Sequence, residues 1–218
     1  MSASDTNKAV ATPKRALVVI DAQNEYFSGD LLIEYPDPQV SIRNIGLAMD
    51  AARAAGIPVL VVQHTAPAGA PIFQKGKPAW ELHDTVKSRR HDHHIEKNMP
   101  SIFTGTDAAA WLKKNGIDTL AITGYMTQNC NASTIYQAMH DGYQVEMLSD
   151  ATGAVPYVNA AGSATAEEVH RVLSVIFHSN FAAVARTADW IKAINAGDVI
   201  AKSNVPASNK AARALKAA

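Results

Sequence analysis

The sequence predicts one α/β domain built on a doubly wound, Rossmann-like parallel sheet with helices on both faces. Short apolar runs rich in β-branched residues alternate along the chain with segments of helical periodicity, which is the pattern of repeated βα units. The runs are continuously apolar, as in strands covered by helices on either side. A chain of 218 residues with 47% hydrophobic content can bury one sizeable core, so one domain is favoured over two.

The strands are expected where the apolar runs are short. The first run, "ALVVID", is rich in Val and Ile and ends in an aspartate. The expected strands cover residues 16–21, 57–64, 94–98, 118–123, 143–148 and 182–185.

The helices are expected between these strands, and each has a start or a stop signal. The first helix covers 38–55 and stops at Gly56. The second begins at Thr106 or Asp107 and ends at Gly116, and the third begins near 132 and ends at Gly142. The fourth begins with the capping box Thr165-x-x-Glu168, and a short fifth helix begins at Thr187.

Three of these helices have a predicted buried face, read from i, i+3, i+4 spacing. The faces are Ile45, Ala48, Met49, Ala52 and Ala55 in the first helix; Ala132, Ile135, Tyr136 and Met139 in the third; and Val169, Val172, Leu173, Ile176 and Phe177 after the capping box.

The expected domain plan has three parts. Residues 1–14 form a flexible N-terminal segment, 15–198 the folded domain and 199–218 a basic, solvated C-terminal tail. Within the domain, residues 65–93 show little periodicity and form an excursion over the surface. Loops of that length in compact domains are commonly functional.

The composition excludes several classes of protein. Twenty basic residues balance twenty acidic ones, so the chain has no general attraction to nucleic acid or to a membrane surface. A single cysteine, Cys130, cannot form an intrachain disulfide. The N-terminus has no apolar signal-peptide region and no segment is long and apolar enough to cross a membrane, so a cytoplasmic location is expected.

Four polar residues follow or end the predicted strands, where ligands bind in parallel sheets. Asp21 ends the first strand, His64 the second, Lys97 lies in the third and Cys130 follows the fourth. An acid, an amine and a thiol can therefore meet at one edge of the sheet.

Cys130 and Asp21 each have two interpretations. At the predicted start of a helix, Cys130 is placed where the dipole and a nearby lysine lower a thiol pKa and produce a nucleophilic thiolate. It can equally be a small buried hydrophobic residue. Asp21 can cap the next turn or, in its apolar setting, serve as a base.

Three ordered segments carry a family resemblance: "ALVVIDAQNEYF", "EKNMPSIFTGT" and "GIDTLAITGYMTQNCNASTIYQAMHDGYQVEMLSDATGA". Over about residues 15–191 they resemble the isochorismatase-like cysteine hydrolases, which include nicotinamidases, carbamoylsarcosine hydrolases and ureidoacrylate amidohydrolases. The resemblance implies a six-stranded parallel sheet and a catalytic triad of Asp21, Lys97 and Cys130. It also implies a cis peptide between Tyr125 and Met126, and an oxyanion hole made of the backbone N–H groups of Met126 and Cys130.

The resemblance implies hydrolysis of a C–N amide, lactam or ureido bond through a thioester, without an organic cofactor. Isochorismatases that cleave a vinyl ether lack the nucleophilic cysteine, whereas this chain has it. Nicotinamidases carry a metal site built on Asp-x-His, and His64 stands here without that aspartate, so no metal is expected. The cluster "HDHH" at 91–94 is interpreted as a surface turn.

The substrate and the assembly are also expectations. The chain looks most similar to the amidases that include streptothricin hydrolases, which open a lactam in a cationic antibiotic, and its net negative middle suits a cation. Substrate-binding residues are expected in loops above the sheet edge: Asn24, Phe27, Trp80, Tyr125 and Gln128. A homo-oligomer is expected through the helix at 165–178 or the apolar excursion, although Phe73 and Trp80 could instead cover the site of their own subunit.

Three alternatives stay open. A metal-dependent, nicotinamidase-like amidase would need further ligands around His64. A nucleotide- or flavin-binding module would need a glycine-rich loop after the first strand, which "DAQNEYFSG" does not provide. A non-hydrolytic reactive-thiol protein would often have a second, resolving cysteine, which this chain lacks.

Overall fold

The structure, a computed structural model, describes residues 12–215 and contains the predicted doubly wound sheet. All five pairings between neighbouring strands are parallel. In spatial order the strands are β3 (His93–Lys97), β2 (Val59–His64), β1 (Arg15–Ile20), β4 (Thr119–Tyr125), β5 (Gln144–Gly153) and β8 (Ala183–Ala185). The predicted strands are confirmed to within a few residues at their ends, except that β5 runs five residues beyond 148.

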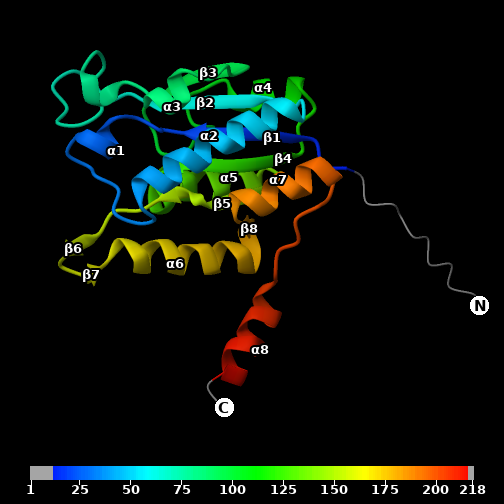
Figure 1. The fold of residues 1–218 in the computed structure, drawn as a ribbon. Coiled ribbons are helices and arrows are strands. Elements are labelled where there is room, and N and C mark those ends of the chain that lie inside the picture. Colours follow the sequence, from blue (N-terminus) through cyan, green and yellow to red (C-terminus); the bar gives the residue numbers. More distant parts are fainter. Residues whose placement is uncertain (1–11, 216–218) are drawn as a thin grey trace, which may run out of the picture.

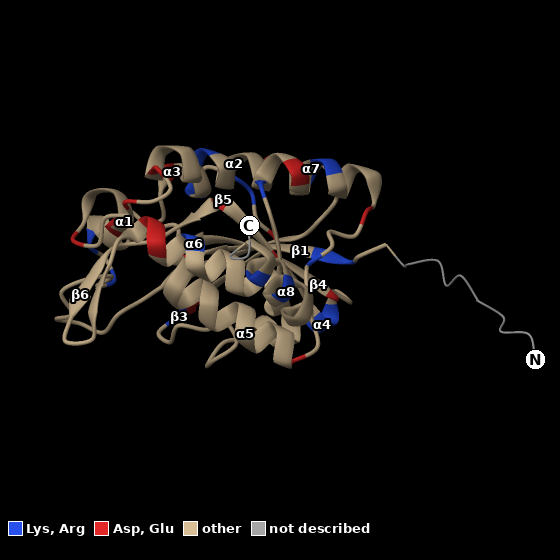
Figure 2. Cartoon of the chain, turned by 90° about the horizontal axis from the view of Figure 1, so that it is seen from below, with Lys and Arg blue, Asp and Glu red and all other residues tan. Residues whose placement is uncertain are grey.

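Helices cover both faces of this sheet (Figure 2). The long helices are α2 (Pro38–Ala54), α4 (Ala108–Lys114), α5 (Ala132–His140), α6 (Ala166–Ile176) and α7 (Thr187–Ala196). Alternate residues of β1 point to opposite cores: Leu17 and Val19 pack with α2 and α7, whereas Val18 and Ile20 pack with α4 and α5. Because both faces of β1 are buried, its sequence is continuously apolar.

Local sequence signals account for the helix ends. Asp37 caps α2 by accepting a hydrogen bond from the backbone N–H of Gln39, and Pro38 occupies the first turn. Thr165 and Glu168 make both hydrogen bonds of the predicted capping box at the start of α6. Gly56 follows α2 with a φ of +68°, a conformation that favours glycine.

The predicted buried face of α6 is only partly confirmed. Phe177 is buried and Leu173 packs against the core, as predicted, whereas Val172 is 45% exposed and Ile176 39%. Ala166 and His170, which were not predicted, are buried instead, and Val175 is 61% exposed. The apolar residues of this helix fit two helical faces, and the packing against β5 and the turn after β4 selects the one that contains His170. Ala55 of α2 is likewise exposed, because it lies beyond the last turn.

Several short elements lie at the carboxyl edge of the sheet. They are α1 (Glu25–Ser28), the 3-10 turn η1 (Pro78–Trp80), α3 (Asp84–Lys87), the π-helical turn η2 (Thr127–Asn131) and the hairpin of β6 (Tyr157–Asn159) and β7 (Gly162–Ala164). A second π-helical turn, η3 (Phe177–Phe181), follows α6. In Figure 1 the excursion after β2 and the β6–β7 hairpin lie at the same edge of the molecule, opposite the N-terminus.

The C-terminal tail contains a helix that the sequence analysis did not predict. Helix α8 (Val205–Leu215) has no buried residue and extends away from the domain (Figure 1). Residues 1–11 of the expected flexible segment and the last three residues of the tail lie outside the described part of the chain. No helix within residues 12–215 is long and apolar enough to cross a membrane.

Candidate active site

The residues predicted at the carboxyl edge of the sheet come together there. Asp21 follows β1, His64 ends β2, Lys97 ends β3 and Cys130 lies in η2, directly after β4. These four strands are neighbours in the order β3, β2, β1, β4, so their carboxyl ends meet at one edge. Close packing is required at this edge, because a Cβ added to Gly124 in β4 would lie 1.9 Å from the carbonyl oxygen of Ile20.

Lys97 is the centre of the cluster. Its Nζ lies 2.7 Å from Asp21 Oδ2, 3.2 Å from Cys130 Sγ and 3.3 Å from His64 Nδ1. An ammonium group has three N–H donors and no acceptor, so all three partners act as acceptors. Burial works to lower the pKa of Lys97, but the charges of Asp21 and Cys130 and the hydrogen bonds they accept raise it. Lys97 therefore keeps its positive charge in this cluster.

Asp21 is fully buried and keeps one oxygen unused. Oδ2 accepts from Lys97, whereas Oδ1 is buried and has no hydrogen-bond partner among the described residues. The backbone of Asp21 has a φ of +50°, an unfavourable region for a residue with a Cβ. Strained positions of this kind cost roughly 1–3 kcal/mol and gather at functional sites. The unused oxygen can accept a proton.

Cys130 is 4% exposed, and its environment differs from the expected one. Burial raises the pKa of the Cys130 thiol, and the charge of Asp21 raises it further, while Lys97 opposes both. The expectation of a resting thiolate with a lowered pKa is therefore wrong. A helix N-terminus and one lysine do not outweigh burial and a neighbouring carboxylate. The thiol needs a base to become a nucleophile, and Asp21 is the adjacent one.

The turn that carries Cys130 is held from both sides. The peptide between Tyr125 and Met126 is cis. Asn131 donates from Nδ2 to the carbonyl of Gly124, and the Thr127 hydroxyl contacts the carbonyl of Gly153 and His170 Nδ1. Burial lowers the pKa of His170 to about 4, so this ring is neutral near pH 7. The buried polar network fixes the position of η2.

A cavity of about 240 Å³ opens next to Cys130. His64, Met126 and Asn129 line it together with residues that the sequence analysis did not single out, among them Tyr26 and Leu31. The excursion covers it and contributes Phe73, which is buried with a φ of +53°. A substrate in this cavity would lie directly against the thiol.

None of the five predicted substrate-binding residues lines this cavity. Tyr125 is fully buried, and its OH lies 2.7 Å from Ser41 Oγ. Phe27 packs against Tyr125, and Asn24 donates to the carbonyl of Pro78. Trp80 donates from Nε1 to Thr65 Oγ1, and Gln128 donates to the OH of Tyr157. These residues support the walls, and their contact with substrate stays a prediction.

Two polar residues that the sequence analysis missed anchor the excursion. Gln23 Nε2 donates to the carbonyls of His64 and Trp80, and Gln23 Oε1 accepts from the backbone of His64. Glu25 is 2% exposed and accepts from the backbone N–H groups of Asp30 and Phe73. Both lie in the stretch directly after Asp21. The available signal was that each side chain combines an aliphatic stem with a polar end.

Of the cluster at 91–94, interpreted as a surface turn, His93 and His94 begin β3, whereas His91 and Asp92 precede the strand. His93 contacts the Asp107 carboxylate and stacks on Trp111, and His94 contacts Gln63. Among residues 12–215, no group of three or more His, Cys, Asp or Glu side chains is arranged to hold a metal ion. Independence from metal stays a prediction.

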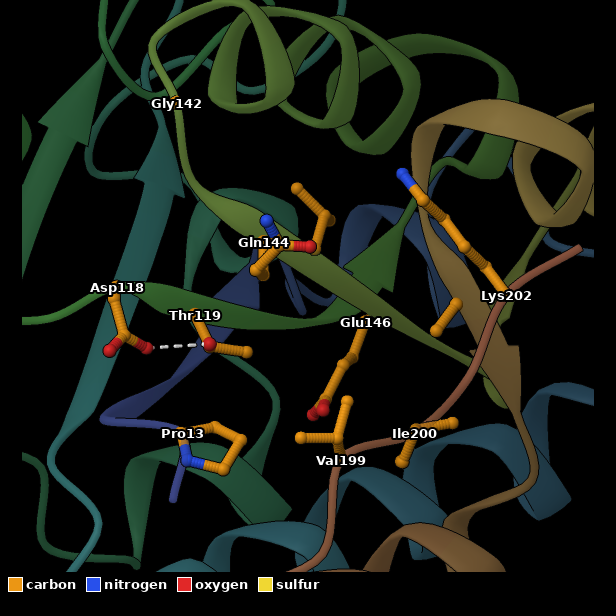
Figure 3. A pocket seen from close by; sticks show the side chains of 11 residues that line it. Pro13, Asp118, Thr119, Gly142, Gln144, Glu146, Val199, Ile200 and Lys202 are labelled. Carbon is orange, nitrogen blue, oxygen red and sulfur yellow. Dashed lines mark hydrogen bonds between the residues drawn. The ribbon is translucent and has the colours of Figure 1, made fainter. Parts of the chain in front are cut away.

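A larger cavity, of about 380 Å³, lies at the opposite edge of the sheet (Figure 3). Glu146 lies beside it and is paired with Arg15, while Val199, Ile200 and Lys202 of the C-terminal segment border it. Asp118 accepts from the hydroxyl of Thr119 and from the backbone of Lys14. No buried side-chain polar atom that lines this cavity is without a hydrogen-bond partner among the described residues.

The chain is similar in sequence to known proteins. The isochorismatase-domain family model matches residues 15–189. The secreted isochorismatase effector Isc1 of Verticillium dahliae is 34% identical over 69% of this chain and 80% of its own length. The streptothricin hydrolase of Streptomyces noursei is 30% identical over 66% of this chain, which spans 56% of that protein. The ureidoacrylate amidohydrolase RutB of Pseudomonas syringae is 31% identical over 63% of this chain and 69% of its own length.

Solved structures agree with these sequence comparisons. A candidate isochorismatase from Burkholderia xenovorans LB400 is 59% identical, with a TM-score of 0.94 over 95% of this chain and 100% of that chain. The N-carbamoylsarcosine amidase of Thermoplasma acidophilum is 25% identical, with a TM-score of 0.66 over 79% of this chain and 96% of that chain. The family model, the relatives and the geometry of the sheet edge agree: the chain belongs to the isochorismatase family and is a hydrolase of that family.

Proposed function

We propose that the protein hydrolyses a C–N amide, lactam or ureide bond of a small molecule through a thioester on Cys130. The observation that carries this proposal is the position of Lys97, whose Nζ contacts both Asp21 and Cys130 in a buried cluster beside a cavity. The amidases among the relatives, which include streptothricin hydrolase and RutB, support an amide substrate.

Asp21 is the general base in the first half of the proposed reaction. Its free Oδ1 takes the proton of the Cys130 thiol as Sγ attacks the carbonyl carbon. Lys97 stabilises the negative charge on both groups. The oxyanion that forms accepts hydrogen bonds from the backbone N–H groups of Met126 and Cys130. The protonated Asp21 then donates its proton to the leaving nitrogen, the C–N bond breaks, and the acyl group remains on sulfur.

Water completes the reaction by the same route. Asp21 removes a proton from water, the hydroxide oxygen attacks the thioester carbonyl, and the C–S bond breaks. The proton on Asp21 returns to the thiolate. The products are a carboxylic acid and an amine or ammonia, and the enzyme regains its starting protonation.

An ammonia-release screen over small amides, lactams and ureides tests this function. We expect turnover by the wild-type protein and a loss of about 10⁴-fold or more in Cys130→Ser, because removing the nucleophile of a triad has effects of this size. A mass increase equal to the acyl group, lost on hydroxylamine treatment, identifies the thioester. Turnover that survives in Cys130→Ser contradicts the proposal.

Treatment with a strong chelator separates this function from the metal-dependent amidase. Full activity after dialysis is expected, because the described residues contain no metal-ligand cluster. Activity that is lost and then restored by zinc favours the nicotinamidase-like alternative. Covalent labelling of Cys130 without turnover of any amide favours the non-hydrolytic thiol protein.

We also propose a homodimer in which α8 of one copy packs on the exposed face of α6 in the other. That face consists of Val172, Val175 and Ile176. Helix α8 has no buried residue and carries Lys210 and Arg213, whereas the first turn of α6 carries two glutamates. Apolar surface and opposite charges thus favour a second copy as the occupant. The excursion is a weaker contributor, because Phe73 faces the cavity of its own subunit.

Light scattering tests the dimer. The expected mass is twice the 23.2 kDa of one chain. Val175→Glu should give the monomer, whereas Val158→Glu, the same change on the 86% exposed hairpin residue, should not. A monomeric wild-type protein rules the dimer out.

The cytoplasmic location also remains a prediction, since one of the relatives is a secreted effector.

A further inference from the structure

We propose that the cavity beside Cys130 selects a small, neutral amide whose non-reacting part is apolar, and that His64 donates a hydrogen bond to an acceptor on that substrate. This inference deepens the proposed function and rests on it.

The lining of the cavity is predominantly apolar. The excursion contributes Ala66, Ala70, Ile72 and Phe73, and Leu31 and Met126 add further apolar lining. Its volume of about 240 Å³ lies below the roughly 300–1,000 Å³ that is typical of sites for drug-sized ligands. A small molecule with an aliphatic or aromatic group therefore fits it.

No residue that lines the cavity is an aspartate, glutamate, lysine or arginine. Two buried carboxylates follow β1, and neither lines the cavity: the charge of Asp21 is balanced by Lys97, and Glu25 accepts from two backbone N–H groups that anchor the excursion. A cationic substrate would find no free counter-charge. Burying an unpaired charge is strongly unfavourable, so the cationic substrate suggested by the net charge does not suit this cavity.

His64 provides a hydrogen-bond donor in this apolar setting. Its Nδ1 lies 3.3 Å from Lys97 Nζ, which can only donate, so Nδ1 carries the lone pair. Burial lowers the pKa of His64, and the charge of Lys97 lowers it further. The ring is therefore neutral, and its one proton is on Nε2. Because His64 lines the cavity next to Cys130, this N–H is available to an acceptor beside the reacting carbonyl.

A matched set of amides tests the substrate class. Pentanamide, 4-aminobutyramide and succinamate have similar size and are neutral, cationic and anionic. We expect kcat/KM for pentanamide to exceed that for 4-aminobutyramide by about a hundredfold or more, because the ammonium group loses its hydration without gaining a partner. Equal values, or a preference for the cation, overturn the proposed class while the proposed function stands.

Protection of Cys130 provides a readout that does not require turnover. Pentanamide should slow the alkylation of Cys130 by iodoacetamide at concentrations where 4-aminobutyramide has no effect. If protection is selective but no amide is hydrolysed, the cavity assignment holds and the proposed function fails. If both compounds protect equally, the cavity assignment fails.

An introduced carboxylate should weaken the preference for the neutral amide. Ala70 is half-buried at the cavity, whereas Ala68 is exposed and does not line it. Ala70→Asp should raise kcat/KM for 4-aminobutyramide relative to pentanamide by about tenfold or more. Ala68→Asp adds the same charge two residues away and should leave the ratio unchanged. A ratio that does not move in Ala70→Asp contradicts the assignment of the lining.

Two substitutions of His64 distinguish the contact at Nδ1 from the proposed hydrogen bond at Nε2. The oxygen of Asn can accept near the position of Nδ1, whereas the amide of Gln can donate near the position of Nε2. With wild type we expect 2-hydroxypentanamide to have a KM about fivefold below that of pentanamide, the value of one hydrogen bond. His64→Gln should keep this preference and His64→Asn should lose it. The same preference in both variants, or its absence in wild type, rules out the proposed donor.

Discussion

Two buried ion pairs lie at opposite edges of the same sheet, and they differ in how many of their carboxylate oxygens accept hydrogen bonds. At the amino edge, Arg15 donates to both oxygens of Glu146, and Trp190 Nε1 donates to Oε2 as well. At the carboxyl edge, Lys97 bonds one oxygen of Asp21, and the other oxygen has no partner among the described residues.

The difference separates a structural pair from a reactive one. Both pairs carry similar desolvation costs, because both side chains of each pair are nearly inaccessible to solvent. The Glu146 carboxylate has no oxygen left for a proton from a ligand, although the larger cavity lies beside it. Asp21 keeps a lone pair next to a buried thiol. The candidate active site is therefore chosen here by the unpartnered carboxylate oxygen beside a thiol, and not by the size of the cavity.

The largest expected effect is on turnover at the carboxyl edge. Asp21→Asn should lower kcat/KM by about 10³–10⁴-fold, because Asp21 transfers protons in both halves of the proposed reaction. Steady-state ammonia release measures this loss. Glu146→Gln, the matched substitution at the amino edge, should leave kcat/KM of the folded protein within about twofold. A comparable loss in both variants would contradict the division into reactive and structural pairs.

The pair at the amino edge should contribute to stability although it has no role in turnover. Glu146→Gln leaves Arg15 buried without a counter-charge, which typically costs about 3–5 kcal/mol. Urea unfolding followed by circular dichroism measures this change. A loss below about 1 kcal/mol would show that the Arg15–Glu146 pair does not stabilise the fold.

Acid sensitivity should also arise near the carboxyl edge. Burial lowers the pKa of His170 from 6.5 to about 4 in the folded protein. As the pH falls below 6.5, the unfolded chain takes up a proton at this residue before the folded protein does, so stability falls. The expected loss between pH 7 and pH 5 is about 2 kcal/mol. His170→Gln should remove that part of the pH dependence, and an unchanged profile in this variant would exclude His170 as its source.

The smallest expected effect concerns the thiol. The charge of Asp21 raises the pKa of Cys130, whereas Lys97 lowers it. Asp21→Asn should therefore increase the rate of Cys130 alkylation by iodoacetamide at pH 7, by about tenfold, even though turnover is lost. Glu146→Gln should not change this rate. Slower alkylation in Asp21→Asn would mean that losing Asp21 as a base outweighs the lower pKa of the thiol, and would contradict this prediction.

The sequence by itself determined the sheet and the main residues of the site. Continuous apolar runs identify strands that are covered on both faces, as β1 illustrates, because a strand with one exposed face would need alternating polar residues. The carboxyl ends of such strands meet at one edge, which brings Asp21, Lys97 and Cys130 together. The resemblance added the cis peptide at Tyr125–Met126, which no periodicity could indicate.

Tertiary structure alone decided which residues line the cavity, which face of α6 is buried and in which direction the pKa of Cys130 is shifted. Tyr125 and Phe73 are both aromatic residues in or near loops, but Tyr125 is enclosed by its neighbours and Phe73 lines the cavity. The face of α6 depends on packing against β5, because its apolar residues satisfy helical spacing on two sides. The pKa of Cys130 depends on burial and on the position of Asp21, 109 residues away in the sequence. Each of these is a property of distances between segments remote in the chain, which local sequence pattern does not encode.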